Sequence, residues 1–170
     1  MTEITIRPAR REHLAALSAI ELAAFETLRR AGAVAGPPTA TAPEVFSRLC
    51  REGLLFAAFS RGDIPVGFAG AYIVDNWLHI AEVDVHPDWQ RQGVGRRLMH
   101  ALLAEVKVRR LNGASLTTDR YAPFNAPFYA SLGFKMLEGK AIPPRLKALL
   151  AAEAINGLDP QRRVAMQLSS

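Results

Sequence analysis

The residues with the clearest chemical potential form a short loop between a strand-like and a helix-like segment. The loop consists of Gln90, Arg91, Gln92, Gly93, Val94 and Gly95. Where a loop opens a helix, the first N–H groups have no acceptor within the helix, and the helix dipole favours negative charge. Gly93 and Gly95 lack the Cβ atoms that would keep a phosphate away from the backbone. Positive charge is added by Arg91, Arg96 and Arg97. We therefore expect a phosphate-binding loop, although an ordinary turn that binds nothing would have the same pattern.

The segments on either side must place this loop at the start of a helix. Residues 78–85 alternate apolar and polar side chains, which predicts a strand, and Pro87 ends it because proline has no N–H to donate. From Gly93 onward apolar residues recur every four positions, which predicts one apolar helix face. A dinucleotide-binding turn would need a third glycine, and a nucleoside-triphosphate loop would need Gly-Lys-Ser/Thr; Gly95 is followed by Arg96 and Arg97 instead.

Length and composition limit the class of protein. The chain has 170 residues, a net charge of +5 and one cysteine, Cys50. This length fits a single domain over residues 1–170, since domains typically hold roughly 100–150 residues. No apolar run approaches the ~20 residues that span a bilayer, and residues 1–4 begin no signal-peptide pattern. A lone cysteine fits a reducing compartment, so we expect a cytoplasmic protein without a membrane partner.

The arginines are scattered, and no basic run is interleaved with aromatic residues, so we expect no nucleic-acid partner. We also expect no metal site.

The remaining pattern predicts alternating strands and helices. We expect strands over residues 4–8, 54–60, 65–74, 78–85, 114–118, 134–137 and 163–168. Helices are expected over residues 9–32 and 42–52, from residue 93 onward, within 122–132 and over 142–155. The three central strands should form an antiparallel meander, and strand 114–118 should run parallel to strand 78–85 after a helical crossover. The 32–43 loop is either a lid over a substrate or a plain surface connection.

Two motifs in this order resemble the GCN5-related N-acetyltransferase (GNAT) family. The first is Gln-x-x-Gly-x-Gly over residues 90–95, after a strand that ends in Val-His-Pro-Asp. The second lies over residues 125–134, where Tyr129 precedes Leu-Gly-Phe. The resemblance covers residues 4–137. It implies a mixed α/β fold with a twisted mixed sheet, flanked by helices and splayed between the parallel strands 78–85 and 114–118.

The resemblance implies that acetyl-CoA is the cofactor and inserts into this splay. Its pyrophosphate would bind backbone N–H groups of residues 92–96, and its pantetheine arm would bind the backbone near Val83 and Val85. The cofactor-binding residues implied are Val83, Asp84, Val85, Gln90, Arg91, Gln92, Gly93, Val94, Gly95, Arg96, Asn125 and Tyr129. The acetyl group would pass directly to an amine, so Cys50 is not expected to act as a nucleophile.

Two candidate catalytic residues follow, each with a structural alternative. Tyr129 would donate a hydrogen bond to the departing thiolate, or would only pack against Phe128 and Phe134. Glu82 would act as the base that deprotonates the amine, or would be a solvated or salt-bridged carboxylate. Asn125 would bind the cofactor arm or cap a short helix.

Other polar residues have simpler expected roles. We expect His79 to be packed or on the surface, and His86 to cap or orient the loop. Glu21 and Glu26 could attract a cationic substrate, but a solvated helix face is the simpler interpretation.

The sequence therefore favours an acetyl-CoA-dependent N-acetyltransferase that acts on a small-molecule amine. A CoA-binding sensor of the same fold, without transferase activity, is the alternative. A homodimer that forms through strand 163–168 is also open.

Overall fold

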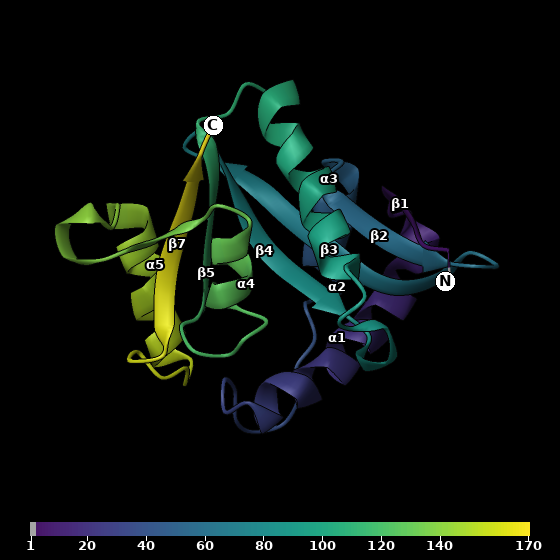
Figure 1. The fold of residues 1–170 in the computed structure, drawn as a ribbon, viewed down its shortest axis with the longest axis horizontal. Helices are drawn as coiled ribbons and strands as arrows, with labels where there is room; N and C mark the ends of the chain where they lie inside the picture. The colour runs from purple at the N-terminus through teal and green to yellow at the C-terminus, as the bar shows by residue number, and fades with distance from the viewer. Residues whose placement is uncertain (1–2) are drawn as a thin grey trace.

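The computed structural model describes residues 3–170, and residues 1 and 2, which begin the stretch tested for a signal peptide, lie outside the described part. The described chain forms one seven-stranded sheet flanked by helices (Figure 1). The strands are β1 (Thr5–Pro8), β2 (Leu55–Ser60), β3 (Ile64–Val74), β4 (Trp77–Val85), β5 (Gly113–Asp119), β6 (Lys135–Leu137) and β7 (Arg163–Ser169). The α-helices are α1 (Leu14–Arg30), α2 (Pro43–Arg51), α3 (Val94–Val108), α4 (Ala126–Ser131) and α5 (Pro144–Ile155). Short 3-10 helices are η1 (Arg11–His13), η2 (Pro87–Trp89) and η3 (Gly139–Ala141).

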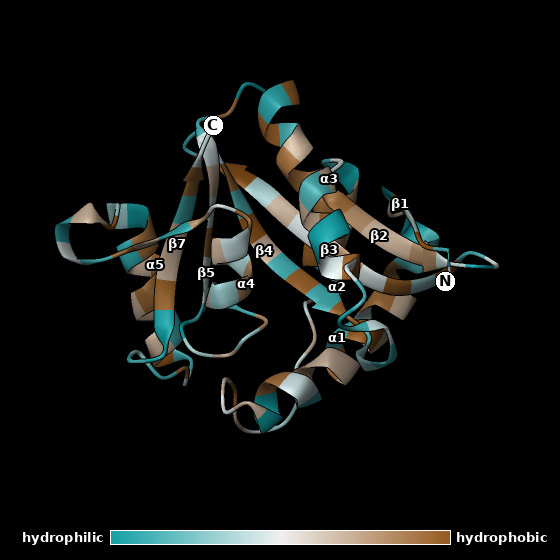
Figure 2. Cartoon of the chain, in the orientation of Figure 1, coloured by the Kyte–Doolittle hydropathy of each residue, from teal (hydrophilic) through white to brown (hydrophobic). Residues whose placement is uncertain are grey.

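Helices pack on both faces of the sheet, because its central strands are apolar on both sides (Figure 2). On one face, Leu98 of α3 and Tyr129 of α4 belong to the larger core cluster. On the other face, Leu17 of α1 and Phe46 of α2 belong to a second cluster. Strand β2 contributes alternate residues to the two clusters, as the pleat of a strand requires. The mixed α/β fold that the sequence predicts is confirmed.

The sheet has the order β1-β2-β3-β4-β5-β7-β6, with antiparallel pairs everywhere except between β4 and β5. These two parallel strands pair only where they begin, at Leu78 with Ala114 and at His79 with Ser115. A register shift opposite Gly70 and Ala71 places an extra residue, Ala81, in β4 just beyond these pairs. Strand β5 pairs along its whole length with β7 instead. The predicted splay between the parallel strands is therefore present, and it opens toward their carboxyl ends (Figure 1).

Two details differ from the sequence expectation. The first helix begins at Leu14 rather than at residue 9, because the Ala9 N–H donates to the Leu55 carbonyl and extends the β1–β2 ladder. Strand β7 is not the edge of the sheet, since residues 165–167 pair with β5 on one side and with β6 on the other. Over those residues β7 therefore offers no open edge to a second copy. Within residues 3–170, every helix is too short or too polar to cross a bilayer.

Candidate active site

A cavity of about 740 Å³ occupies the splay between β4 and β5. Its walls come from the second half of β4, the middle of β5, the start of α3, helix α4 and the carboxyl end of α1. Because the strands diverge there, groups from both faces of the sheet reach the same space. All of the predicted cofactor-binding residues except Gln92 line this cavity.

The glycine loop opens α3 as the sequence predicts. Gly93 is the residue before the helix, with φ of 79°, and a Cβ there would meet no atom within 4 Å. Glycine is therefore favoured here by its left-handed backbone rather than by crowding. The Arg97 N–H donates to the Gly93 carbonyl at 3.1 Å, so the N–H groups of residues 94–96 lie in the first turn, before the regular ladder. This end of α3 lies in the cavity wall.

Side chains around the loop fix its position. The Gln90 Nε2 donates to the Val85 carbonyl at 2.9 Å, and the Gln92 Nε2 donates to the Asp88 carbonyl at 3.3 Å. His86 caps η2, because its Nδ1 accepts from the Asp88 N–H at 3.1 Å. Of the two expected roles of His86, capping is confirmed.

Three carboxylates from two elements meet on the β4 side of the cavity, where Glu82 and Asp84 line the wall. Glu82 and Asp84 lie on β4 and Glu21 lies on α1, and their oxygens come within 4.8 Å of one another. Glu21 is buried, so the expected solvated position was wrong. Its carboxylate accepts hydrogen bonds from the backbone N–H and, at 2.6 Å, from the hydroxyl of Thr41. Glu26, one turn further on, is partly exposed and pairs with Arg29 at 3.4 Å.

Burial and mutual repulsion change the protonation of this carboxylate cluster. Burial raises the pKa of Glu82 well above its ordinary value, and the charges of Asp84 and Glu21 raise that pKa further. Burial, with the charge of Glu21, raises the pKa of Asp84 to about 7. The Oδ2 atom of Asp84 is buried without a hydrogen-bond partner among the described residues. The pair on β4 can therefore hold a proton near neutral pH and release it.

Tyr129 reaches the cavity from α4, on the opposite face of the sheet from α1. Its ring packs at centroid distances of 5.1 Å from Phe128 and 5.9 Å from Phe134. Burial raises the pKa of Tyr129, and the negative charges of Asp84 and Glu82 raise it further. The hydroxyl therefore keeps its proton near neutral pH and can donate a hydrogen bond. Tyr129 therefore packs against its aromatic neighbours and also lines the cavity.

Asn125 does not cap α4 with its side chain, so the capping interpretation was wrong. Its Nδ2 donates to the Thr118 hydroxyl on β5 at 2.8 Å. Its Oδ1 is buried and accepts no hydrogen bond within residues 3–170. An unused acceptor in the wall of a cavity fits a ligand that brings an N–H group.

The other reactive side chains lie away from this centre. His79 is buried at the paired end of β4, 2.9 Å from the Ser115 hydroxyl, and burial together with the Arg145 charge lowers its pKa to about 4. Cys50 lies on α2 and contacts the Ala9 carbonyl at 3.3 Å. Neither residue lines the cavity. The burial of His79 confirms that it is a packed residue.

Sequence reasoning missed one side chain of the cavity wall and misplaced a second side chain beside it. Arg163 lines the wall and pairs with Glu153 at 3.0 Å. Glu21 was expected to attract a cationic substrate or, more simply, to lie on a solvated helix face, although it falls within the buried stripe of α1 that contains Leu17 and Ala24. The position of a charged residue inside an apolar helix stripe could have predicted that Glu21 is buried.

Comparison with known proteins defines the class. Residues 20–134 match the model of the acetyltransferase (GNAT) family, and the chain therefore belongs to this family.

Several solved structures share the fold at low sequence identity. The ribosomal-protein-S18-alanine N-acetyltransferase of Escherichia coli is 22% identical, with a TM-score of 0.69, over 98% of this chain and 94% of that chain. A GNAT-family acetyltransferase of Staphylococcus aureus Mu50 is 17% identical, with a TM-score of 0.73, over 98% of this chain and 100% of that chain. The PaiA N-acetyltransferase of Thermoplasma acidophilum, in complex with coenzyme A, is 16% identical, with a TM-score of 0.68, over 99% of each chain.

Proposed function

We propose that this protein transfers an acetyl group from acetyl-CoA to the amine of a small molecule. Membership of the GNAT family implies acyl transfer from acetyl-CoA, and the PaiA relative is described in complex with coenzyme A. The observation that carries the proposal is the cavity in the splay, where the α3 loop, the β4 carboxylates and the Tyr129 hydroxyl meet. We further propose that residues 1–170 act as one domain in the cytoplasm.

The residues present fit the proposed cofactor. The first turn of α3, with Arg91 and Arg96 beside it, offers N–H groups and positive charge to a pyrophosphate. The unused Oδ1 of Asn125 offers an acceptor to an amide N–H of the pantetheine arm. When bound, acetyl-CoA supplies the acetyl group as an activated thioester.

The carboxylate cluster supports the handling of the acceptor amine. An aliphatic amine is mostly protonated at neutral pH and must lose a proton before it can attack a carbonyl carbon. Glu21, Glu82 and Asp84 attract the ammonium ion, and the β4 pair takes the proton, with Glu82 as the proposed base. A base is most effective when its pKa lies near the working pH. Burial and the Glu21 charge raise the pKa of Asp84, the neighbour of Glu82 in this pair, to about 7.

Tyr129 supports the departure of the thiolate. Because the negative cluster and burial keep its hydroxyl protonated, the group can donate a hydrogen bond as negative charge develops on sulfur. Such a bond is stronger in the transition state than in the ground state, and it therefore accelerates the reaction.

A transferase and a CoA-binding sensor are separated by two measurements on the same samples. Calorimetric titration gives the affinity for acetyl-CoA, and release of free thiol with a panel of small amines gives turnover. For the transferase we expect tight binding with turnover in the wild type, and tight binding with little turnover in Glu82→Gln. Binding without turnover on any amine would favour the sensor, and no binding would contradict both.

A further inference from the structure

The splay divides the sheet into two halves, one with strands β1–β4 and the other with strands β5–β7. At its open end the two halves need contacts other than backbone pairing. Beyond the pairs at Leu78 and His79, β4 and β5 share no ladder. On the face of α3 and α4, the Arg96 Nη2 donates to the Ser131 hydroxyl at 2.7 Å and joins the two halves beside the glycine loop. A second arginine, Arg162, joins the halves at the carboxyl end of α1.

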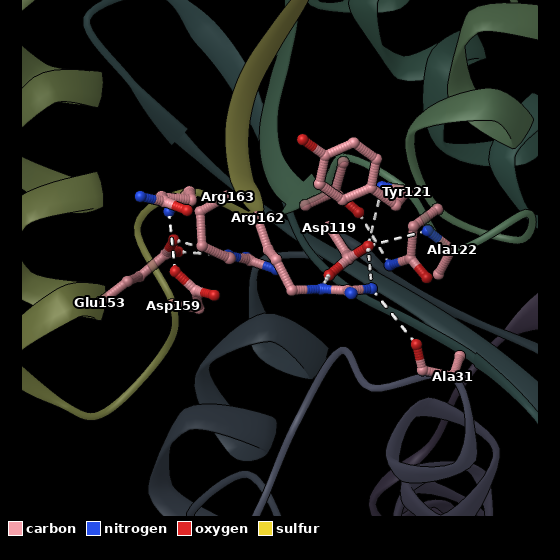
Figure 3. Close-up of polar contacts among 11 residues, drawn as sticks. Ala31, Asp119, Tyr121, Ala122, Glu153, Asp159, Arg162 and Arg163 are labelled. Carbon is pink, nitrogen blue, oxygen red and sulfur yellow. Dashed lines mark hydrogen bonds and ion pairs between the residues drawn. The ribbon is translucent and has the colours of Figure 1, made fainter.

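Arg162 immediately precedes β7 and is held in a fixed geometry by Asp119 at the end of β5 (Figure 3). The guanidinium donates two hydrogen bonds, from Nε to Oδ2 at 2.8 Å and from Nη2 to Oδ1 at 3.1 Å. Asp119 is fully buried and also accepts from the N–H groups of Tyr121 and Ala122. This bidentate arrangement fixes the direction of the arginine side chain.

The same guanidinium also reaches the other half of the molecule. Its Nη2 donates to the Ala31 carbonyl at 3.2 Å, at the point where α1 ends and the loop to α2 begins (Figure 3). The far end of that loop is held by the two hydrogen bonds from Thr41 to Glu21. The α1–α2 loop (residues 31–42) is thus attached to the far half at one end and to the carboxylate cluster at the other.

The attached loop forms part of the cavity wall. Leu28 and Val34, on either side of Ala31, line the cavity, and so do Phe124 and Leu158 from the other half. A peptide acceptor would have to continue past this wall, since an extended chain adds ~3.3–3.6 Å of length per residue. A compact amine can lie wholly inside the cavity.

We propose that Arg162 is a positioning residue that restricts the acceptor to small amines, by holding the α1–α2 loop against the β5–β7 half of the molecule. The inference rests on the proposed function and names a determinant of its substrate range. It predicts that loss of the Ala31–Arg162–Asp119 bridge opens the acceptor end and leaves the glycine loop unchanged.

The test compares the wild type with Arg162→Ala, with Arg162→Lys, and with Arg30→Ala, which removes an exposed arginine from the last turn of α1. Each protein is assayed with a small aliphatic amine and with a ten-residue peptide that has a free amino terminus. For Arg162→Ala we expect the ratio of kcat/KM for the peptide to that for the amine to rise about tenfold, mainly through KM. Acetyl-CoA affinity should change less than about twofold, and Arg30→Ala should match the wild type.

Hydrogen exchange of residues 31–42 provides a readout that does not depend on turnover. We expect faster exchange there in Arg162→Ala than in Arg30→Ala, and an intermediate rate in Arg162→Lys, which keeps the charge but not the bidentate geometry. If the alanine variant fails to fold, the lysine variant carries the same comparison.

Three results overturn the inference. They are an unchanged acceptor ratio despite faster loop exchange, unchanged loop exchange, and a wild type that accepts peptide and small amine equally. All three leave the proposed function standing. A wild type that acetylates no amine at all would instead overturn the proposed function, and the inference with it.

Discussion

The glycine loop and the carboxylate cluster lie at the same cavity but are built in different ways. The loop is a continuous segment, and its chemistry comes from backbone N–H groups at the start of α3. The cluster joins side chains of α1 and β4. Glu21 lies 61 residues before Glu82 and still further before Asp84. The first kind of site is visible as a motif, whereas the second depends on which helix packs over which strand. Variants in the two regions should therefore fail in different ways.

The largest expected effect is on turnover, in the carboxylate cluster. Glu82→Gln removes the proposed base, and we expect kcat to fall about a hundredfold or more, because general base catalysis contributes roughly 10²–10⁴-fold. Affinity for acetyl-CoA should stay close to that of the wild type. Steady-state thiol release and calorimetry measure the two quantities, with Glu44→Gln on the exposed start of α2 as the control. Retained turnover in Glu82→Gln would assign the base to another group.

A loop variant should have the opposite profile. Gly93→Asp places a negative charge at the start of α3, and we expect acetyl-CoA affinity to fall about a hundredfold, or about 2.7 kcal/mol. Gly62→Asp is the matched control, because Gly62 also has a positive φ, 82°, with no atom within 4 Å of a Cβ, but lies in the β2–β3 turn. Equal binding by the two variants would show that the loop does not hold the phosphates.

The same difference between the two regions explains which features could be predicted from the sequence and which could not. The alternation of apolar and polar residues, together with the turn residues, predicted the antiparallel meander and the parallel strand, because each depends on local patterns. The loop was predictable for the same reason. The burial of Glu21, the free Oδ1 of Asn125 and the position of β7 inside the sheet were not, since each follows from contacts between distant segments.

Tyr129→Phe should give a smaller loss of turnover. Phenylalanine keeps the ring contacts with Phe128 and Phe134 and removes only the hydroxyl. We expect kcat to fall about tenfold with little change in acetyl-CoA affinity, because one hydrogen bond to the developing charge is lost. The same assays measure both quantities. An unchanged kcat would leave Tyr129 with a packing role alone.

The pH dependence of turnover should report on the cluster rather than on the loop. Because the carboxylate base must be ionised, kcat/KM should rise with pH through an apparent pKa near 7, the value to which burial and Glu21 raise the pKa of Asp84. This apparent value belongs to the Glu82–Asp84 pair as a unit. A pH–rate profile measures it, and a profile that is flat between pH 5 and 9 would contradict a carboxylate base.

The smallest expected effect is on stability. A carboxyl group whose pKa is higher in the folded state binds more protons there, so the free energy of unfolding falls as pH rises from ~4 to about 7. Asp84→Asn removes the destabilisation caused by the ionised carboxylate. We expect the Tm of this variant at pH 8 to exceed that of the wild type by about 2–4 °C, with a smaller difference at pH 5. Thermal melts at both pH values measure this, with the exposed Asp63→Asn as the control. Equal differences at the two pH values would mean that folding does not raise the pKa of Asp84.

Mass spectrometry of a reaction mixture with acetyl-CoA and a panel of small amines tests direct acetyl transfer. We expect one amine to gain a single acetyl group while the mass of the protein stays unchanged, since Cys50 lies outside the cavity and no acyl-enzyme is formed. An acetylated protein, or a cofactor that is bound but never consumed, would contradict direct transfer at this site.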